Sequence, residues 1–247
     1  KQRLQRELQS MAGKSLEPLM GSNTCYMCDA LATTKEHIPP KALFPKQKDL
    51  LGEFSLRKEL ITVPSCEEHN NNKSRDDEYL VFCLSTCFHG NDIKEQLFNT
   101  KIMRAIERRP DTYSNFLDNY QRVMLKHPDG KVEHTAAYSI DLKRFDNVLS
   151  HIARGLYYHH TQTKWEGPAL VMSNELRDLS SKNSEEINAI TDDTIERVSA
   201  FLFDTESYGQ NPEVFSYKIH DSRPKGFVIL MKFYSAMTVA VTLAENS

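Results

Sequence analysis

The chain has 247 residues, of which 39% are hydrophobic and 26% are charged, enough to bury one sizeable core or two modest ones. No apolar run approaches the roughly 18 residues that span a bilayer, and no charged-then-apolar leader opens the chain. We therefore expect a cytoplasmic protein with no membrane partner. Of the five cysteines, two form a Cys-x-x-Cys motif, which favours reduced thiols and metal binding over a disulfide framework.

The net charge of −3 is unevenly distributed along the chain. Residues 89–165 carry 12 Lys and Arg against 9 Asp and Glu, whereas residues 166–247 carry 7 against 13. The middle segment is therefore the expected phosphate-facing surface. The acidic C-terminal segment is expected to face a protein partner and not nucleic acid.

Two parts are predicted in the first third of the chain. Residues 1–21 form an N-terminal helix with an apolar stripe suited to docking on the body or on a partner. Residues 22–88 form a unit with a short strand that runs into Glu36 and His37, a proline-rich loop, a second strand near 60–63 and a helix from about Asn71. The prolines restrict the loop backbone and exclude helix, which suits a loop that must hold a side chain still.

The other two parts are a helical region, residues 89–165, and a C-terminal antiparallel β-rich region, residues 166–247. Together with the first unit they define an α+β fold. Helices are predicted over 93–109, 112–126 and 142–160. In the last helix, apolar residues at helical spacing predict a core-facing stripe of Phe145, Leu149, Ile152 and Leu156. Runs rich in β-branched residues predict a meander of strands over 215–219, 227–233 and 237–243, with 168–172 as a possible further strand.

Four residues have the spacing of a zinc site. Cys25 and Cys28 form one pair, and Cys66 and His69 form a second, each with two residues between its members. Two such pairs can close a tetrahedral zinc site, because each turn presents both ligand atoms to one ion. A single Cys-x-x-Cys is weak evidence, since neighbouring cysteines in a reduced protein are often only buried thiols, but the second pair makes structural zinc the favoured interpretation.

Two further cysteines lie four residues apart, Cys83 and Cys87, with His89 close behind. A second metal site is one interpretation. We favour buried core thiols, because the surrounding residues are apolar and free cysteine is a common core residue. His159 and His160, at the end of a predicted helix, are expected to be surface residues.

The order of these motifs resembles the HNH endonucleases. Cys-x-x-Cys is followed by Glu36-His37-Ile-Pro-Pro-Lys and then by Cys-x-x-His with Asn70 directly after it. The resemblance covers roughly residues 22–88 and implies a zinc-stapled ββα-metal core. It also implies that His37 is the general base that deprotonates water, and that Glu36 binds a catalytic divalent metal. Asn70 would either ligate that metal or fix the loop that carries the base.

The third ligand of the catalytic metal is less clearly marked. The family commonly has histidine or asparagine in the helix after Asn70, whereas this chain offers Lys73, Asp76, Asp77 and Glu78. Asp77 ranks first because it lies seven residues after Asn70 and would share a helix face with it.

Hydrolysis of a phosphodiester also suits these residue types on chemical grounds. A divalent cation neutralises developing charge, and a base that titrates near neutral pH activates water. The oxygen ligands Glu36, Asn70 and Asp77 suit Mg²⁺ or Mn²⁺, in contrast to the sulfur-rich zinc site. DNA is the expected substrate because the family mostly cuts DNA.

Five basic residues are candidate nucleic-acid contacts. They are Lys73 and the helically spaced set of Lys101, Arg104, Arg108 and Arg109. Such a row can bind phosphates along a groove, although a solvated helix face gives the same pattern.

Family analogy suggests a restriction or phage-defence effector controlled by a regulatory protein. The rival hypothesis is a zinc-stapled module that binds nucleic acid or protein and has no catalytic activity.

Overall fold

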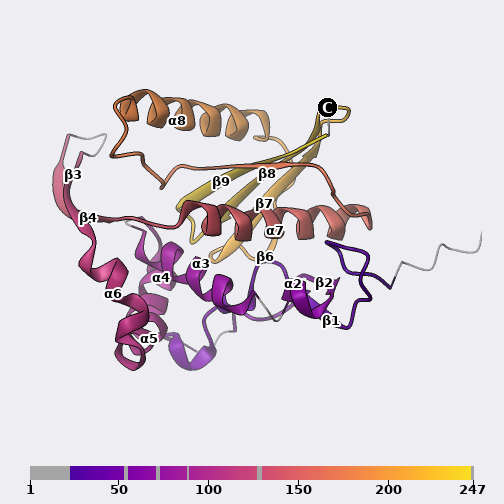
Figure 1. The fold of residues 1–247 in the computed structure, drawn as a ribbon, viewed down its shortest axis with the longest axis horizontal. Coiled ribbons are helices and arrows are strands. Elements are labelled where there is room, and N and C mark those ends of the chain that lie inside the picture. The colour runs from indigo at the N-terminus through magenta and orange to yellow at the C-terminus, as the bar shows by residue number, and fades with distance from the viewer. Residues whose placement is uncertain (1–22, 53–54, 71–72, 88, 127–129, 246–247) are drawn as a thin grey trace, which may run out of the picture.

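The fold is described for residues 23–245, apart from 53–54, 71–72, 88 and 127–129, in a computed structural model. The predicted helix in residues 1–21 lies outside this range. Within it the chain is mixed α+β, as predicted, and its elements lie in layers (Figure 1). No helix in the described part of the chain is both long and apolar enough to cross a membrane.

A five-stranded antiparallel sheet forms the central layer, with strand order β5-β9-β8-β7-β6. The predicted C-terminal meander is therefore confirmed, and the additional strand expected near 168–172 is present as β5 beside β9. The strands are β5 Ala169–Ser173, β6 Tyr208–Asn211, β7 Phe215–Asp221, β8 Gly226–Phe233 and β9 Met237–Ala244.

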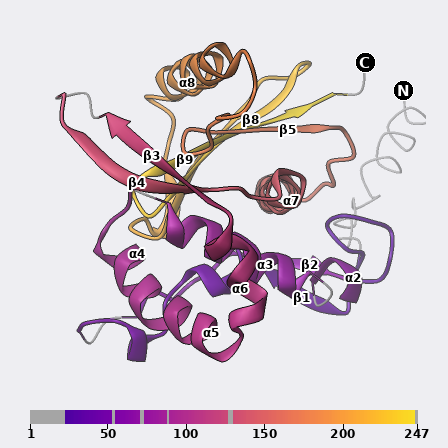
Figure 2. The same cartoon turned by 60° about the vertical axis from the view of Figure 1, so that its left-hand side comes forward.

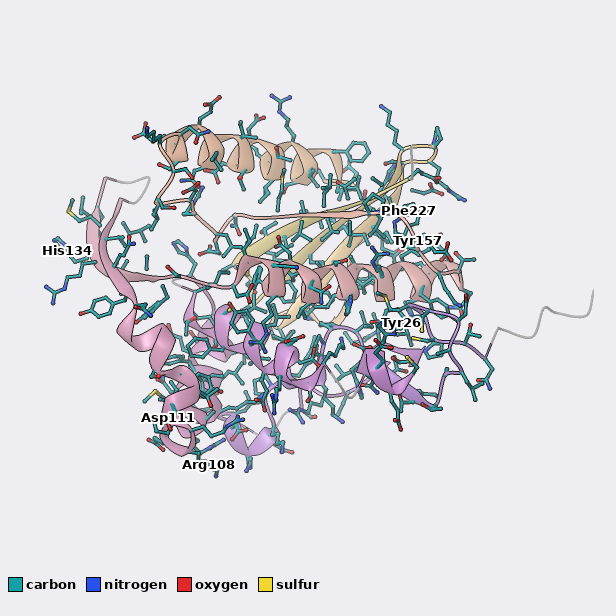
Figure 3. The ribbon with its side chains drawn as sticks, viewed as in Figure 1. Tyr26, Arg108, Asp111, His134, Tyr157 and Phe227 are labelled. Atoms are coloured by element: carbon teal, nitrogen blue, oxygen red, sulfur yellow. The ribbon has the colours of Figure 1, made fainter. Side chains whose placement is uncertain are left out.

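Helix α7, Leu142–Thr161, covers one face of this sheet, and α8, Ser184–Phe201, covers the other (Figures 1 and 2). Alternate residues of β8, from Phe227 to Phe233, are buried on the α7 side, as expected for a strand with period-2 apolar residues. The rings of Tyr157 and Phe227 meet between the two layers, with centroids 4.8 Å apart (Figure 3).

Helix α7 is central because it packs on both sides. It contacts β5 and β9 of the sheet and also β2 and α3 of the N-terminal unit. The predicted stripe is fully buried, with 0% exposure for Phe145, Leu149, Ile152 and Leu156. The 20-residue helix thus joins the core of the C-terminal sheet to the unit that contains the candidate site.

In the described residues of the N-terminal unit, residues 23–87, there are two short strands and two α-helices. β1, Thr34–His37, pairs antiparallel with β2, Thr62–Ser65, so that Glu36 lies opposite Val63. The four-residue helix α2, Glu67–Asn70, follows β2, and α3, Ser74–Thr86, comes next. The strand–loop–strand–helix order was predicted, and the loop contains two short 3-10 turns, Lys41–Leu43 and Gln47–Asp49.

The region 89–165 is less helical than predicted. Its helical elements are α4 Asp92–Leu97, a π-helical turn Phe98–Ile102, α5 Met103–Arg108 and α6 Pro110–Asp118. The predicted helix over 112–126 is wrong beyond Asp118, because β3, Tyr120–Lys126, pairs there with β4, Val132–Tyr138.

The alternation of exposed and half-buried residues explains this hairpin. Tyr120, Arg122 and Met124 are exposed, whereas Val123 and Leu125 are half-buried, which is the period of a strand and not of a helix. Gly130 adopts a positive φ of 84° between the strands, a conformation that glycine tolerates without strain.

Helix α8 was also not predicted. Of its side chains only Ile195 is fully buried, so its apolar periodicity is weak.

Candidate metal centre and the strands beside it

Three cysteines and one histidine from separate segments meet at one end of the N-terminal unit. Cys25 and Cys28 precede β1, Cys66 follows β2, and His69 lies in α2. Their ligand atoms all lie within 4.8 Å of one another. The Nδ1 atom of His69 is 3.6, 3.5 and 3.3 Å from the sulfur atoms of Cys25, Cys28 and Cys66.

These separations match a tetrahedral zinc site. The sulfur atoms of Cys28 and Cys66 are 3.8 Å apart, and Zn–S bonds of about 2.3 Å place two tetrahedral sulfur ligands about 3.8 Å apart. The group can therefore hold a metal ion, consistent with the predicted structural zinc. Burial raises the pKa of Cys25, but backbone hydrogen bonds, the largest from Met27, lower it overall, and zinc binds the thiolate form.

Backbone hydrogen bonds attach this group to the hairpin. Tyr26 N donates to Pro64 O over 2.8 Å, and Thr33 N donates to Ser65 O over 3.1 Å. The turn that carries Cys25 is closed by a 2.8 Å hydrogen bond from the amide of Cys25 to Ala30 O. A metal at this group would therefore hold β1, β2 and α2 together.

Glu36 points from β1 into the interior. Its side chain is 2% exposed and forms an ion pair with Lys73, which precedes α3. The Lys73 ammonium also lies 3.6 Å from Asp77 Oδ1. Burial dominates over the opposing effect of the nearby Lys73 charge and raises the pKa of Glu36 to about 7. Burial likewise raises the pKa of Asp77.

His37 follows Glu36 on the same strand and is only half-buried. Successive side chains of a strand point to opposite faces, so the two adjacent residues diverge. Burial lowers the pKa of His37, and the positive charges of Lys41 and Arg57 lower it further. His37 is therefore mostly neutral at pH 7, with its lone pair available to accept a proton.

Asn70 connects α2 to β1. Its Nδ2 atom donates to Thr34 Oγ1 over 2.9 Å and to Lys35 O over 3.3 Å. Asn70 was expected either to ligate the metal or to fix the segment that carries the base. These hydrogen bonds suit the second role, because they attach Asn70 to the strand that carries His37.

In the structure the carboxylates of Glu36 and Asp77 lie close together, but the group between them is the ammonium of Lys73. Asn70 directs its amide nitrogen to β1 instead. With the ammonium in place, the predicted oxygen ligands Glu36, Asn70 and Asp77 do not form a site for a divalent cation. A Mg²⁺ or Mn²⁺ ion would need the space that Lys73 occupies.

Most of the predicted nucleic-acid contacts bind protein atoms. Lys73 is 6% exposed. Lys101 Nζ donates to Ala42 O over 2.7 Å, Arg104 Nη2 lies 2.6 Å from Asp49 Oδ1, and Arg109 Nη2 lies 3.1 Å from Glu78 Oε2. Arg108 is exposed at the periphery of the molecule (Figure 3).

Sequence reasoning did not identify Lys41 and Arg57 as neighbours of His37. Lys41 lies only four residues after His37, so its position within the motif was a usable signal. Arg57 lies 20 residues away in the loop between β1 and β2, and nothing in its local sequence marks it. The Arg57 side chain is held by a 2.8 Å hydrogen bond from its Nε to Phe44 O.

Cys83 and Cys87 do not belong to a metal-ligand group within the described residues. Cys83 is buried, which raises the pKa of its thiol to about 12. His89 Nδ1 lies 3.2 Å from Glu175 Oε1. These positions agree with core thiols and not with a second metal site. His159 and His160 are exposed, as predicted.

Fold and site together define a mixed α+β protein in which a Cys₃His group able to hold a metal lies beside a two-stranded hairpin. Comparisons with family models, with curated proteins and with solved structures found no match.

Proposed function

We propose that this protein is an HNH-like endonuclease that hydrolyses phosphodiester bonds in DNA. The observation that carries the proposal is the environment of His37. It is half-buried and positioned at the end of β1, and two cations, Lys41 and Arg57, are close enough to lower its pKa. Asn70 is hydrogen-bonded to the strand that presents it, and backbone hydrogen bonds attach the Cys₃His segment to the same hairpin.

This arrangement supports a general-base mechanism. Neutral His37 accepts a proton from a water molecule, and the water oxygen forms a bond to phosphorus. The bond from phosphorus to the departing sugar oxygen breaks, and that oxygen takes a proton from solvent. Lys41 and Arg57 offset the negative charge of the phosphate, which otherwise repels the nucleophile. Zinc at the Cys₃His group would fix the geometry of the hairpin and take no part in the chemistry.

The requirement for Mg²⁺ or Mn²⁺ is part of the proposal. Glu36 and Asp77 are the carboxylates that would hold the ion, and they could do so only if the Lys73 ammonium left them. By family analogy, the proposed nuclease acts in restriction or phage defence and is controlled by a regulatory protein.

A cleavage assay tests the proposal. Supercoiled plasmid, linear single-stranded DNA and RNA are incubated with the zinc-loaded protein in Mg²⁺, Mn²⁺ or EDTA. We expect metal-dependent DNA cleavage that falls at least about 100-fold in His37→Ala, the lower range for loss of a general base. His159→Ala, an exposed histidine on α7, is the matched control and should cleave normally.

The alternative function is a binding module without catalytic activity. The observation that favours it is the ion pair between Lys73 and Glu36, which occupies a predicted metal ligand. In that case the wild type cleaves none of the substrates but retards DNA or RNA in a gel-shift assay, and His37→Ala has no activity to lose.

A further inference from the structure

A buried polar group lies between β1, α3 and the turn that carries Cys25. Its members are Glu36 and Lys73, at 2% and 6% exposure, Asp77, whose side chain is 20% exposed, and Tyr26, at 1% exposure. Lys73 contacts the carboxylates of both Glu36 and Asp77. The group thus contains two carboxylates and one ammonium.

The single ammonium does not satisfy all of these buried groups. Among the described residues, Glu36 Oε1 and Asp77 Oδ1 have no hydrogen-bond partner apart from their ion pairs with Lys73. Buried charges and polar atoms are costly unless they are paired and hydrogen-bonded. Lys73 supplies one positive charge between the two carboxylates. A divalent cation would supply the two charges that balance both carboxylates when both are ionised.

Lys73 and a divalent cation have the same ligand preference at this point. Mg²⁺ and Mn²⁺ take carboxylate oxygens, as an ammonium does. The Lys73 side chain is a flexible four-carbon stem with a point charge at its end, and it precedes α3 as the residue before the first helical turn. Displacement of the ammonium from the carboxylates would therefore require rotation of side-chain bonds of Lys73 and not movement of the helix.

We propose that Lys73 is a built-in cation at the Glu36 and Asp77 carboxylates, and that Mg²⁺ or Mn²⁺ binds there only by displacing its ammonium. The displaced ammonium becomes available to a substrate phosphate, which reconciles its burial with the predicted contact to nucleic acid. The inference rests on the proposed function for the use of the metal, but its test measures binding and not cleavage.

Mn²⁺ binding to the zinc-loaded protein tests the competition. Free Mn²⁺ is counted by electron paramagnetic resonance in wild type, in Lys73→Met and in the double variant Lys73→Met/Glu36→Gln. We expect Lys73→Met to bind Mn²⁺ at least about tenfold more tightly than wild type, because the competing charge is gone. The double variant should lose this gain. Lys35→Met removes an equal charge from the exposed face of β1 and should leave the affinity within about twofold of wild type.

Equal Mn²⁺ affinity in folded wild type and Lys73→Met would overturn the inference, as would tighter binding that survives Glu36→Gln. If Lys73→Met does not fold, lysine acetylation of the wild type followed by mass spectrometry gives a second test. Lys73 should be protected without Mn²⁺ and become modified at saturating Mn²⁺. Protection that persists while Mn²⁺ is bound overturns the inference.

The two proposals fail separately. A protein that cleaves DNA while Lys73→Met gains no Mn²⁺ affinity contradicts only the displacement of Lys73. A gain in Mn²⁺ affinity without cleavage of any substrate contradicts only the nuclease.

Discussion

Gly155 of α7 packs directly on Ile38, the residue that follows His37. A Cβ atom added at Gly155 would lie 2.6 Å from both Cδ1 and Cγ1 of Ile38. Ile38 is 1% exposed, and its amide donates to Ile61 O over 2.9 Å. The side chain therefore has little room to move. The central helix thus fixes the loop after β1, and through it the position of His37.

Gly155→Ala should destabilise the protein by about 1 kcal/mol. Alanine favours helix by about 1 kcal/mol over glycine, but overpacking of a buried site costs about 1 to 3 kcal/mol. Urea unfolding measures the net change, and cleavage should fall because the strand carrying His37 shifts. Adding Ile38→Val removes Cδ1, one of the two contacted atoms, and should restore part of the loss. A variant more stable than wild type would show that α7 does not press on this loop.

Zinc content should depend on Cys66 and not on Cys87. Cys66→Ser removes one of the four ligands, whereas Cys87→Ser changes a cysteine outside the group. We expect one zinc per chain in wild type and Cys87→Ser, and little in Cys66→Ser, measured by elemental analysis. Because structural zinc contributes on the order of 10 kcal/mol of binding free energy, Cys66→Ser should also unfold at a much lower temperature. Equal zinc in both variants would rule out the Cys₃His site.

Arg104 and Arg108 should differ in their effect on stability. Arg104 Nη2 lies 2.6 Å from Asp49, whose side chain is 3% exposed, whereas Arg104 itself is 42% exposed. Arg104→Gln leaves a buried carboxylate without its cation and should cost about 2 kcal/mol, less than for a fully buried pair. Arg108→Gln should change the unfolding free energy by under about 0.5 kcal/mol. Similar losses in urea unfolding would contradict the structural role of Arg104.

For DNA binding the order of the two arginines should be reversed, with Arg108 contributing more than Arg104. Arg108 is exposed, so Arg108→Gln should weaken binding of DNA of any sequence and reduce the slope of log K against log salt by about 1. Arg104→Gln should leave the slope nearly unchanged because its charge already faces Asp49. Fluorescence anisotropy over a salt series measures both slopes. An unchanged slope in Arg108→Gln would show that Arg108, at the end of α5, does not contact nucleic acid.

Local signals were sufficient for the parts of the molecule that depend on short motifs. The Cys₃His group was predictable because each ligand pair has a fixed spacing, and β7 to β9 were predictable because buried strands need β-branched apolar runs. The pairing of Lys73 with Glu36 was not predictable, since the residues lie 37 positions apart and either could have faced solvent. Strand β3 was missed because a seven-residue strand directly after α6 has no proline or glycine to mark the change.

Because of Lys101, the free energy of unfolding should increase as the pH rises from about 8 to 10.5. Burial, and after it the positive charge of Arg57, lowers the pKa of Lys101 from 10.5 to about 8, although the negative charges of Glu78 and Asp49 act in the opposite direction. Between pH 8 and 10.5 the folded protein releases this proton while the unfolded chain keeps it, so the unfolded state binds more protons and stability increases with pH. Below pH 8 both states are charged, and this contribution is absent.

The comparison of wild type with Lys101→Met isolates this effect from other titrating groups. The unfolding free energy of wild type should increase relative to the variant by about 2 to 3 kcal/mol from pH 7.5 to pH 10.5. Urea unfolding at a series of pH values measures the difference. Lys131→Met, which changes an exposed lysine at the hairpin turn, should show no such pH dependence. A constant difference between wild type and Lys101→Met would mean that Lys101 reaches solvent instead of Ala42 O, and would return it to the set of residues available to DNA.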